Sequence, residues 1–272
     1  MNRPNSRRNL DIAIERIAGA RDPLRLRRLM ANAVVAQLLP DGVVKGGSAL
    51  KLRFGSDATR FSTDLDAART LEVEDYIKAL DAALEEGWNG FTGTLVRKPQ
   101  AHPAGVPQCY VMQPFDVKLS YNGKSWITVP LEVGHNEIGD AEDPDMVIPE
   151  ELSRTFEELG FPALEPMPLM RLPYQVAQKL HGVSEKGSDR AHDLVDLQVQ
   201  LSEGDVNLGE TRAICARLFD YRGLQPWPPR IEKGAAWEVL YAEAAEGLGV
   251  IPDADEAVAW ANELVRRIEE AG

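Results

Sequence analysis

The sequence VVKGGSALKLRFG occupies residues 43–55, and RFSTDLD follows at residues 60–66. The β-branched pair before the glycines predicts a short strand over 43–45, and residues 49–54 predict a helix. A Gly-Gly-Ser turn between a strand and a helix lets backbone N–H groups approach an anion, and the helix N-terminus adds a favourable dipole. Gly46, Gly47 and Ser48 are therefore candidate ligands of a phosphate, although the spacing excludes a Walker A loop.

Two carboxylates follow this turn. Asp64 and Asp66 are two residues apart, so on a strand both side chains point to one face while Leu65 points to the other. Carboxylates side by side repel each other, and a divalent, oxygen-seeking cation such as Mg²⁺ relieves that cost. A solvated Asp-x-Asp pair at a strand end is the alternative, and the anion-binding turn just upstream favours the metal site.

Length and composition are those of a globular chain. The 272 residues are 44% hydrophobic and 27% charged, which is enough apolar material for a core. The sequence has no apolar run near the roughly 20 residues of a membrane span, and its start does not resemble a secretory signal. Cys109 and Cys215 alone make neither a metal site nor a disulfide framework. We therefore expect a cytoplasmic protein with no membrane partner.

The net charge of −13 is unevenly distributed along the chain. Residues 1–60 contain 12 lysines and arginines against 5 acidic residues, whereas residues 61–272 contain 18 against 38. Such asymmetry is typical of a chain with one basic surface for polyanions. Solvated helices that happen to be rich in arginine would give the same counts, so both interpretations stay open.

Periodicity divides the chain into three regions. Residues 1–40 predict a basic helical segment, with one helix ending near Gly19 and a second opened by Pro23. Residues 41–148 mix strands with helices and predict a sheet core flanked by helices. Residues 149–272 predict a helical C-terminal domain. The order indicates an α+β fold.

Within the middle region, strands are expected at residues 43–45, 63–68, 92–96, 109–121 and 126–133, with a helix at 71–86. Asn122-Gly123 predicts a hairpin between the last two strands. Pro130 predicts that the last strand lies at an edge or carries a bulge. In the helical region, Ser188 or Asp189 is expected to cap a helix running to residue 200.

Two further motifs follow in the helical region: QKLH at residues 178–181 and RAHDLVDL at residues 190–197. Together with KGGSAL and RFSTDLD, they resemble the motifs of the AbiEii/AbiGii family of nucleotidyltransferase toxins, which includes the MenT toxins. That family belongs to the polymerase-β-like nucleotidyltransferase superfamily. The resemblance covers residues 43–197, over half of the chain, and implies a polymerase-β-like nucleotidyltransferase core.

The resemblance implies roles residue by residue. Asp64 and Asp66 would be catalytic and would hold Mg²⁺, with two ions expected. Lys179 would contact the triphosphate, and Asp193 would be a further catalytic acid. The implied nucleotide-binding residues are Gly46, Gly47, Ser48, Arg60 and Lys179.

The superfamily also places a third metal-binding carboxylate on a neighbouring strand. Glu132 is our candidate, because its neighbours Leu131 and Val133 should face the other way, and Asp116 is the competing candidate. If Glu132 has this role, it replaces the aspartate that is usual in the superfamily. Structural alternatives exist for the helical motifs too, since Lys179 lies at the edge of an apolar stripe, where a lysine is most often solvated.

The resemblance implies an enzyme that transfers a nucleoside monophosphate from a nucleoside triphosphate (NTP) to an RNA acceptor, such as the 3′ end of tRNA. This would block translation, and a cognate antitoxin is implied as a partner. One alternative is transfer to a protein or small molecule, and another is an inactive nucleotide-binding module. An inactive module should have lost part of its site, whereas Asp64, Asp66, Lys179 and Asp193 are all present. No motif indicates which NTP is used.

Overall fold

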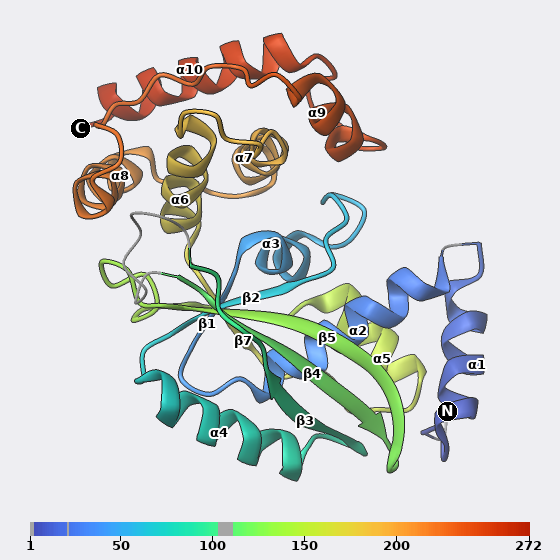
Figure 1. Ribbon diagram of the computed structural model, residues 1–272. Helices are drawn as coiled ribbons and strands as arrows, with labels where there is room; N and C mark the ends of the chain where they lie inside the picture. The colour runs from blue at the N-terminus through green and yellow to red at the C-terminus, as the bar shows by residue number, and fades with distance from the viewer. Residues whose placement is uncertain (1–2, 21, 103–110) are drawn as a thin grey trace. The chain divides into compact units, whose positions relative to one another are not determined.

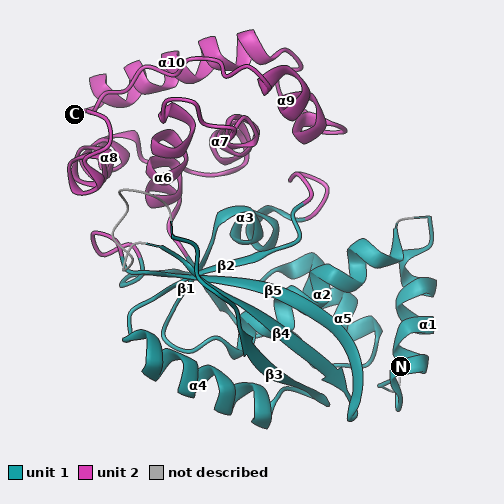
Figure 2. Cartoon of the chain, viewed as in Figure 1, with its two compact units in different colours: residues 1–55, 62–136, 141–169 teal, residues 56–61, 137–140, 170–272 magenta. Residues whose placement is uncertain are grey.

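The computed structural model describes residues 3–20, 22–102 and 111–272 (Figure 1). The chain divides into two compact units (Figure 2). Each unit has its own apolar core. Unit 1 consists of residues 1–55, 62–136 and 141–169, and unit 2 of residues 56–61, 137–140 and 170–272. These units do not follow the three regions expected from the sequence, because segments distant in the chain pack into each core.

The two N-terminal helices form where the sequence predicts them. They are α1 (Arg7–Ala18) and α2 (Pro23–Leu38). Ser6 caps α1 by accepting a hydrogen bond from the Asn9 backbone N–H at 3.3 Å, and Asp22 caps α2 through the Leu24 N–H at 2.9 Å. These caps satisfy N–H groups that have no partner within the helix. Buried residues of both helices belong to the core of unit 1, so this segment is part of unit 1.

Unit 1 is built on a mixed sheet of seven described strands, in the order β3-β4-β5-β2-β1-β7-β6. The pairs β2–β5 and β1–β7 are parallel, and the remaining neighbours are antiparallel. With helices before, between and after the strands, this sheet confirms the predicted α+β class. The strands are β1 (Gly42–Lys45), β2 (Leu65–Arg69), β3 (Phe91–Arg97), β4 (Gln113–Tyr121), β5 (Lys124–His135), β6 (Asp145–Val147) and β7 (Met167–Leu169).

The β4–β5 hairpin turns at Asn122-Gly123, as predicted, and both residues have positive φ. Pro130 lies at a local edge, as predicted: although β5 lies between β4 and β2, Pro130 itself pairs only with Asp116 of β4. The register irregularity of the hairpin is at Trp126 of β5, opposite residues 119–120 of β4. Pairing of β5 with β2 begins only at Leu131, so no β2 residue pairs with Pro130. The expected start of a strand at Cys109 lies outside the described residues.

Three helices of unit 1 accompany the sheet: α3 (Gly46–Phe54), α4 (Val73–Glu86) and α5 (Glu150–Glu158). An aromatic cluster explains why residues up to 169 belong to this unit. The rings of Phe156 and Phe161 lie 5.7 Å apart, and Phe161 lies 5.4 Å from Phe91 on β3. The chain after residue 149 was expected to be helical only. Instead β7 pairs with β1, which long-range packing decides and local periodicity does not reveal.

Unit 2 is predominantly helical, with a core that contains Trp237 and Tyr241. The predicted cap at Ser188 or Asp189 was wrong. The helix there begins at His192, and its N-cap residue Ala191 offers no side-chain hydrogen bond. The described helices of unit 2 are α6 (Leu172–Ser184), α7 (His192–Glu203), α8 (Leu208–Arg222), α9 (Trp237–Ala245) and α10 (Ala254–Glu270). Among the described helices of the chain, none combines the length and apolarity needed to cross a membrane.

Candidate active site

Three adjacent strands of unit 1 place charged side chains in one row. In the antiparallel β1–β2 pair, Lys45 lies opposite Asp66, and in the parallel β2–β5 pair, Asp66 lies beside Glu132. Residues in register on neighbouring strands point to the same face of a sheet, so these three share a face. Asp64 immediately precedes β2, which begins at Leu65. We call Asp64, Asp66 and Glu132 the carboxylate row.

The electrostatics of the row is that of negative charges held together. Partial burial raises the pKa of Glu132, and the charges of Asp66 and Asp64 raise it further. Lys45 and Lys98 oppose this rise. Carboxylate oxygens that repel one another are the donor set that a hard divalent cation such as Mg²⁺ prefers. The chemistry of the row therefore fits such an ion. As they stand, however, the described residues contain no group of three or more His, Cys, Asp or Glu side chains arranged to hold a metal.

The two candidates for the third carboxylate are placed differently. Glu132 lies on β5, directly beside Asp66, and its neighbours Leu131 and Val133 are buried on the opposite face. Asp116 lies on β4, which does not pair with β2, and it is in register with Pro130. Its carboxylate accepts a hydrogen bond from Lys98 at 3.3 Å. The geometry therefore favours Glu132 as the partner of Asp66.

The Gly-Gly-Ser turn approaches the row closely. The sequence predicts a helix from residue 49, but α3 begins at Gly46, so the turn is itself the first helical turn. Gly46 has φ +64°, and a Cβ added there would lie 2.3 Å from Asp66 Oδ2. Two reasons therefore require a glycine at this position: its backbone has a positive φ, and a side chain would collide with the Asp66 carboxylate. Gly47 and Ser48 follow in the same turn and are buried.

Helix α3 also holds the segment that carries Asp64. The Ser48 hydroxyl, predicted to bind phosphate, donates instead to the backbone carbonyl of Asp64. One turn later, the buried ammonium of Lys51 donates to the Ser62 carbonyl at 2.6 Å and to its hydroxyl at 2.9 Å. Lys51 was not among the predicted site residues. Its spacing of three residues from Ser48 was the available signal, because such residues share a helix face.

The remaining predicted residues form a buried ionic network within unit 2. Lys179 on α6 donates to Asp193 Oδ1 at 2.9 Å and to Asp196 Oδ2 at 2.6 Å. Arg190 Nε donates to Asp193 Oδ2 at 2.6 Å. Arg60 grips both oxygens of Asp196, with two hydrogen bonds of 3.0 Å. We call these five residues the ionic network. Asp196 was not among the predicted site residues.

Burial and charge act in opposite directions in the network. Burial alone would raise the pKa of Asp193, but Lys179 and Arg190 hold it well below its usual range. Burial likewise opposes the charge on Lys179, yet the two aspartates hold the pKa of this ammonium above its usual value. The opposite charges of the network thus favour the ionised forms of Lys179, Asp193 and Asp196. In this structure, Arg60 and Lys179, both predicted to bind the nucleotide, donate hydrogen bonds to buried carboxylates.

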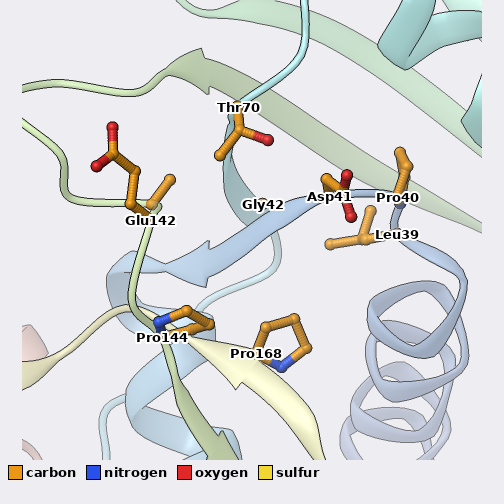
Figure 3. Close-up of a pocket in the computed structure, with 9 residues that line it drawn as sticks. Leu39, Pro40, Asp41, Gly42, Thr70, Glu142, Pro144 and Pro168 are labelled. Atoms are coloured by element: carbon orange, nitrogen blue, oxygen red, sulfur yellow. The ribbon is translucent and has the colours of Figure 1, made fainter.

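A hollow of about 500 Å³ lies at the other end of β1 and β2 (Figure 3). It is lined by Gly42 at the start of β1 and by Thr70 just after β2, whereas Asp66 pairs with the last residue of β1. Asp41 and Glu142 contribute its acidic groups. The hollow is thus separate from the carboxylate row, and none of the predicted site residues lines it.

Comparisons with known proteins give one family match and several similar solved structures. A scan against family models matches residues 28–263 to the family described as nucleotidyl transferase AbiEii toxin, type IV TA system. Among solved structures, MenT4, a nucleotidyltransferase toxin from Mycobacterium tuberculosis, is 18% identical, with 96% of this chain and 97% of that chain covered and a TM-score of 0.49. JHP933 from Helicobacter pylori is 18% identical, with 91% of each chain covered and a TM-score of 0.46. A search of curated protein sequences finds no significant match.

Proposed function

The chain belongs to the AbiEii family of nucleotidyl transferase toxins from type IV toxin–antitoxin systems, and we propose that it transfers a nucleoside monophosphate from an NTP to the 3′ end of an RNA, with tRNA as the acceptor. Family membership confirms the prediction of a nucleotidyltransferase. Such transfer onto tRNA would block translation, and a cognate antitoxin would counteract it. The observation that carries the proposal is the register of Asp66 beside Glu132, with Asp64 preceding them and the Gly46 turn against them.

In the proposed reaction, the acceptor hydroxyl oxygen forms a bond to the α-phosphorus of the NTP. The bond from that phosphorus to the β-phosphate oxygen breaks, and pyrophosphate leaves. The hydroxyl proton passes to a carboxylate of the row. A divalent cation held by Asp64, Asp66 and Glu132 would supply charge neutralisation and would acidify the hydroxyl. The Gly46–Ser48 turn would offer its backbone N–H groups to the phosphates at the start of α3.

We propose two roles for the ionic network. Lys179 would contact the triphosphate, as the family resemblance implies, by exchanging one of its two carboxylate partners for a phosphate oxygen. Asp193 and Asp196 would keep the ammonium charged and in place when no nucleotide is bound. Arg60 is then a residue that holds Asp196 rather than a primary nucleotide ligand, because the Nε–Nη2 edge of its guanidinium already faces that carboxylate.

An RNA acceptor is supported by the basic N-terminal part of unit 1. Exposed arginines of α1 and α2 include Arg7, Arg8, Arg16 and Arg25, in a segment where basic residues outnumber acidic ones. Each contact of such a residue with a phosphate releases counterions, so RNA affinity should fall steeply with salt. Binding of an uncharged small-molecule acceptor would not show this dependence.

The test is labelling of total RNA by each of four α-³²P NTPs in the presence of Mg²⁺. We expect a tRNA-sized product with the wild type and a loss of at least about 100-fold with Glu132→Gln or Asp64→Ala. Asp116→Asn is the matched control, because it neutralises a carboxylate on β4 that does not pair with β2. If Glu132→Gln labels RNA as well as the wild type does, Glu132 is not the third metal-binding carboxylate. Absence of any NTP binding by the wild type would contradict the central proposal.

A further inference from the structure

Lys45 lies beside the carboxylate row, and neither the family motifs nor the proposed reaction gives it a role. It is the last residue of β1, directly before the Gly46 turn, and it is in register with Asp66. Its side chain therefore points to the face of the sheet on which Asp66 and Glu132 lie. A lysine here is notable because this is the face on which the donor set fits a divalent cation.

The position of the ammonium is marked by Gly134. This glycine follows Glu132 by two residues on β5, so both point to the same face. A Cβ added at Gly134 would lie 3.1 Å from Lys45 Nζ. The lysine side chain thus extends from β1 across β2, which lies between the two strands, and its charged end reaches β5.

Gly134 is what leaves room for this reach. It is buried, and any larger residue would bring an atom against the ammonium. The electrostatic effect of the lysine agrees with its position: Asp66 and Asp64 raise the pKa of Glu132, and Lys45 lowers it. The lysine and the acidic residues therefore form one charged assembly.

We propose that Lys45 is the resident counter-ion of the carboxylate row and competes there with the divalent cation. The ammonium stabilises the row while no ion is bound and repels an incoming cation, so it sets how tightly the ion is held. Lys45 is thus a positioning residue of the row rather than a catalytic one. The inference rests on the proposed function for the identity of the site, but its test does not depend on activity.

The experiment measures binding of Mn²⁺ to the full chain, without nucleotide, by electron paramagnetic resonance of the free ion. Lys45→Gln should bind Mn²⁺ about tenfold more tightly than the wild type, because it removes a unit positive charge from beside the row, and charges in proximity repel even at the dielectric constant of water. Lys124→Gln is the matched control, since it removes the same charge from the opposite end of β5 and should leave the affinity unchanged. Unchanged or weaker binding by Lys45→Gln would overturn the inference.

Thermal unfolding and a second variant, Gly134→Ala, show whether a change in Mn²⁺ binding comes from misfolding. In EDTA, Lys45→Gln should unfold at a lower temperature than the wild type, and Mn²⁺ should close that gap. Gly134→Ala should displace the ammonium without removing its charge, and should tighten Mn²⁺ binding by less than Lys45→Gln does. A larger gap with Mn²⁺ present would contradict competition.

Failure of the proposed function would look different. If wild type binds Mn²⁺ and Asp64→Ala abolishes binding, the metal site stands and only the role of Lys45 is under test. If neither protein binds Mn²⁺, the carboxylate row is not a metal site, and both proposals fail together.

Discussion

Replacing Lys179 by methionine removes the cation at the centre of the ionic network. The side chains of Asp193 and Asp196 are only 1% and 2% exposed, and both accept hydrogen bonds from this ammonium. In the variant, Asp193 keeps Arg190 and Asp196 keeps Arg60. Each buried carboxylate would therefore keep one arginine, but the positive charge that lies between the two carboxylates would be lost.

The magnitude follows from the cost of leaving a buried charge without its partner. Breaking a buried ion pair by removing one member typically costs about 3–5 kcal/mol. Because each aspartate retains an arginine, we expect the lower end of this range, about 3 kcal/mol of the free energy of unfolding of unit 2. Methionine is of similar length and is apolar, so a cavity should add little to this value.

The assay must report on unit 2 alone, because a chain of two units need not unfold in one step. Amide hydrogen exchange followed by mass spectrometry on peptides from α6 and α7 meets this need. Lys186→Met is the matched control, since it removes an exposed lysine in the turn after α6 and should change protection by less than about 0.5 kcal/mol.

The pH dependence of the stability difference between wild type and Lys179→Met provides an independent test. The pKa values of Asp193 and Asp196 lie below their ordinary range in the folded chain. Their ionised form therefore contributes stability above about pH 4, the ordinary value for aspartate, and this contribution is lost as the pH falls further. The gap between wild type and Lys179→Met should be full at pH 7 and should narrow below pH 4. A gap under about 1 kcal/mol at pH 7, or one that widens in acid, would refute the reasoning.

Three further outcomes are expected. Gly46→Ala should lose most RNA-labelling activity, because its Cβ would collide with the Asp66 carboxylate. Gly123 also has a positive φ, but a Cβ there meets no other atom within 4 Å. Gly123→Ala should therefore lose only about 1 kcal/mol of stability, measured by thermal unfolding. Ser48→Ala should lower kcat about tenfold with little change in KM for the NTP if its hydroxyl positions Asp64, and a pure rise in KM would show that it binds phosphate instead. His181 is buried beside Phe219, and burial lowers its pKa to about 4. Wild-type stability should therefore decline between pH 6.5 and pH 4, and His181→Met should show a shallower decline.

Local patterns in the chain were sufficient for many elements. The pairing of Asp22 with Pro23 marks the start of α2, and Asn122-Gly123 marks the β4–β5 turn, since caps and tight turns depend on a few neighbouring residues. The spacing of Asp64 and Asp66 was less decisive, because β2 begins at Leu65 and only Asp66 lies within the strand. The start of α7 was misjudged because its N-cap, Ala191, makes no side-chain hydrogen bond that a sequence could reveal.

Contacts between distant segments were beyond the reach of such patterns. Arg60 and Asp196 are 136 residues apart, and nothing in either motif indicates that they form a two-pronged ion pair. Strand β7 is three residues long, and it is a strand only because β1 and β6 lie on either side of it. Short strands have little propensity of their own, because their hydrogen bonds come from the partner.

The amino-acid order alone was enough to identify the candidate groups: two closely spaced carboxylates, a small-residue turn suited to an anion, and a lysine and aspartates on later helices. Which of these groups meet was settled by strand register. Glu132 rather than Asp116 stands beside Asp66, and Lys45 joins them, because β5 and β1 flank β2 with those residues in line. Residue types and spacing are properties of a local segment, whereas register results from the packing of the whole sheet.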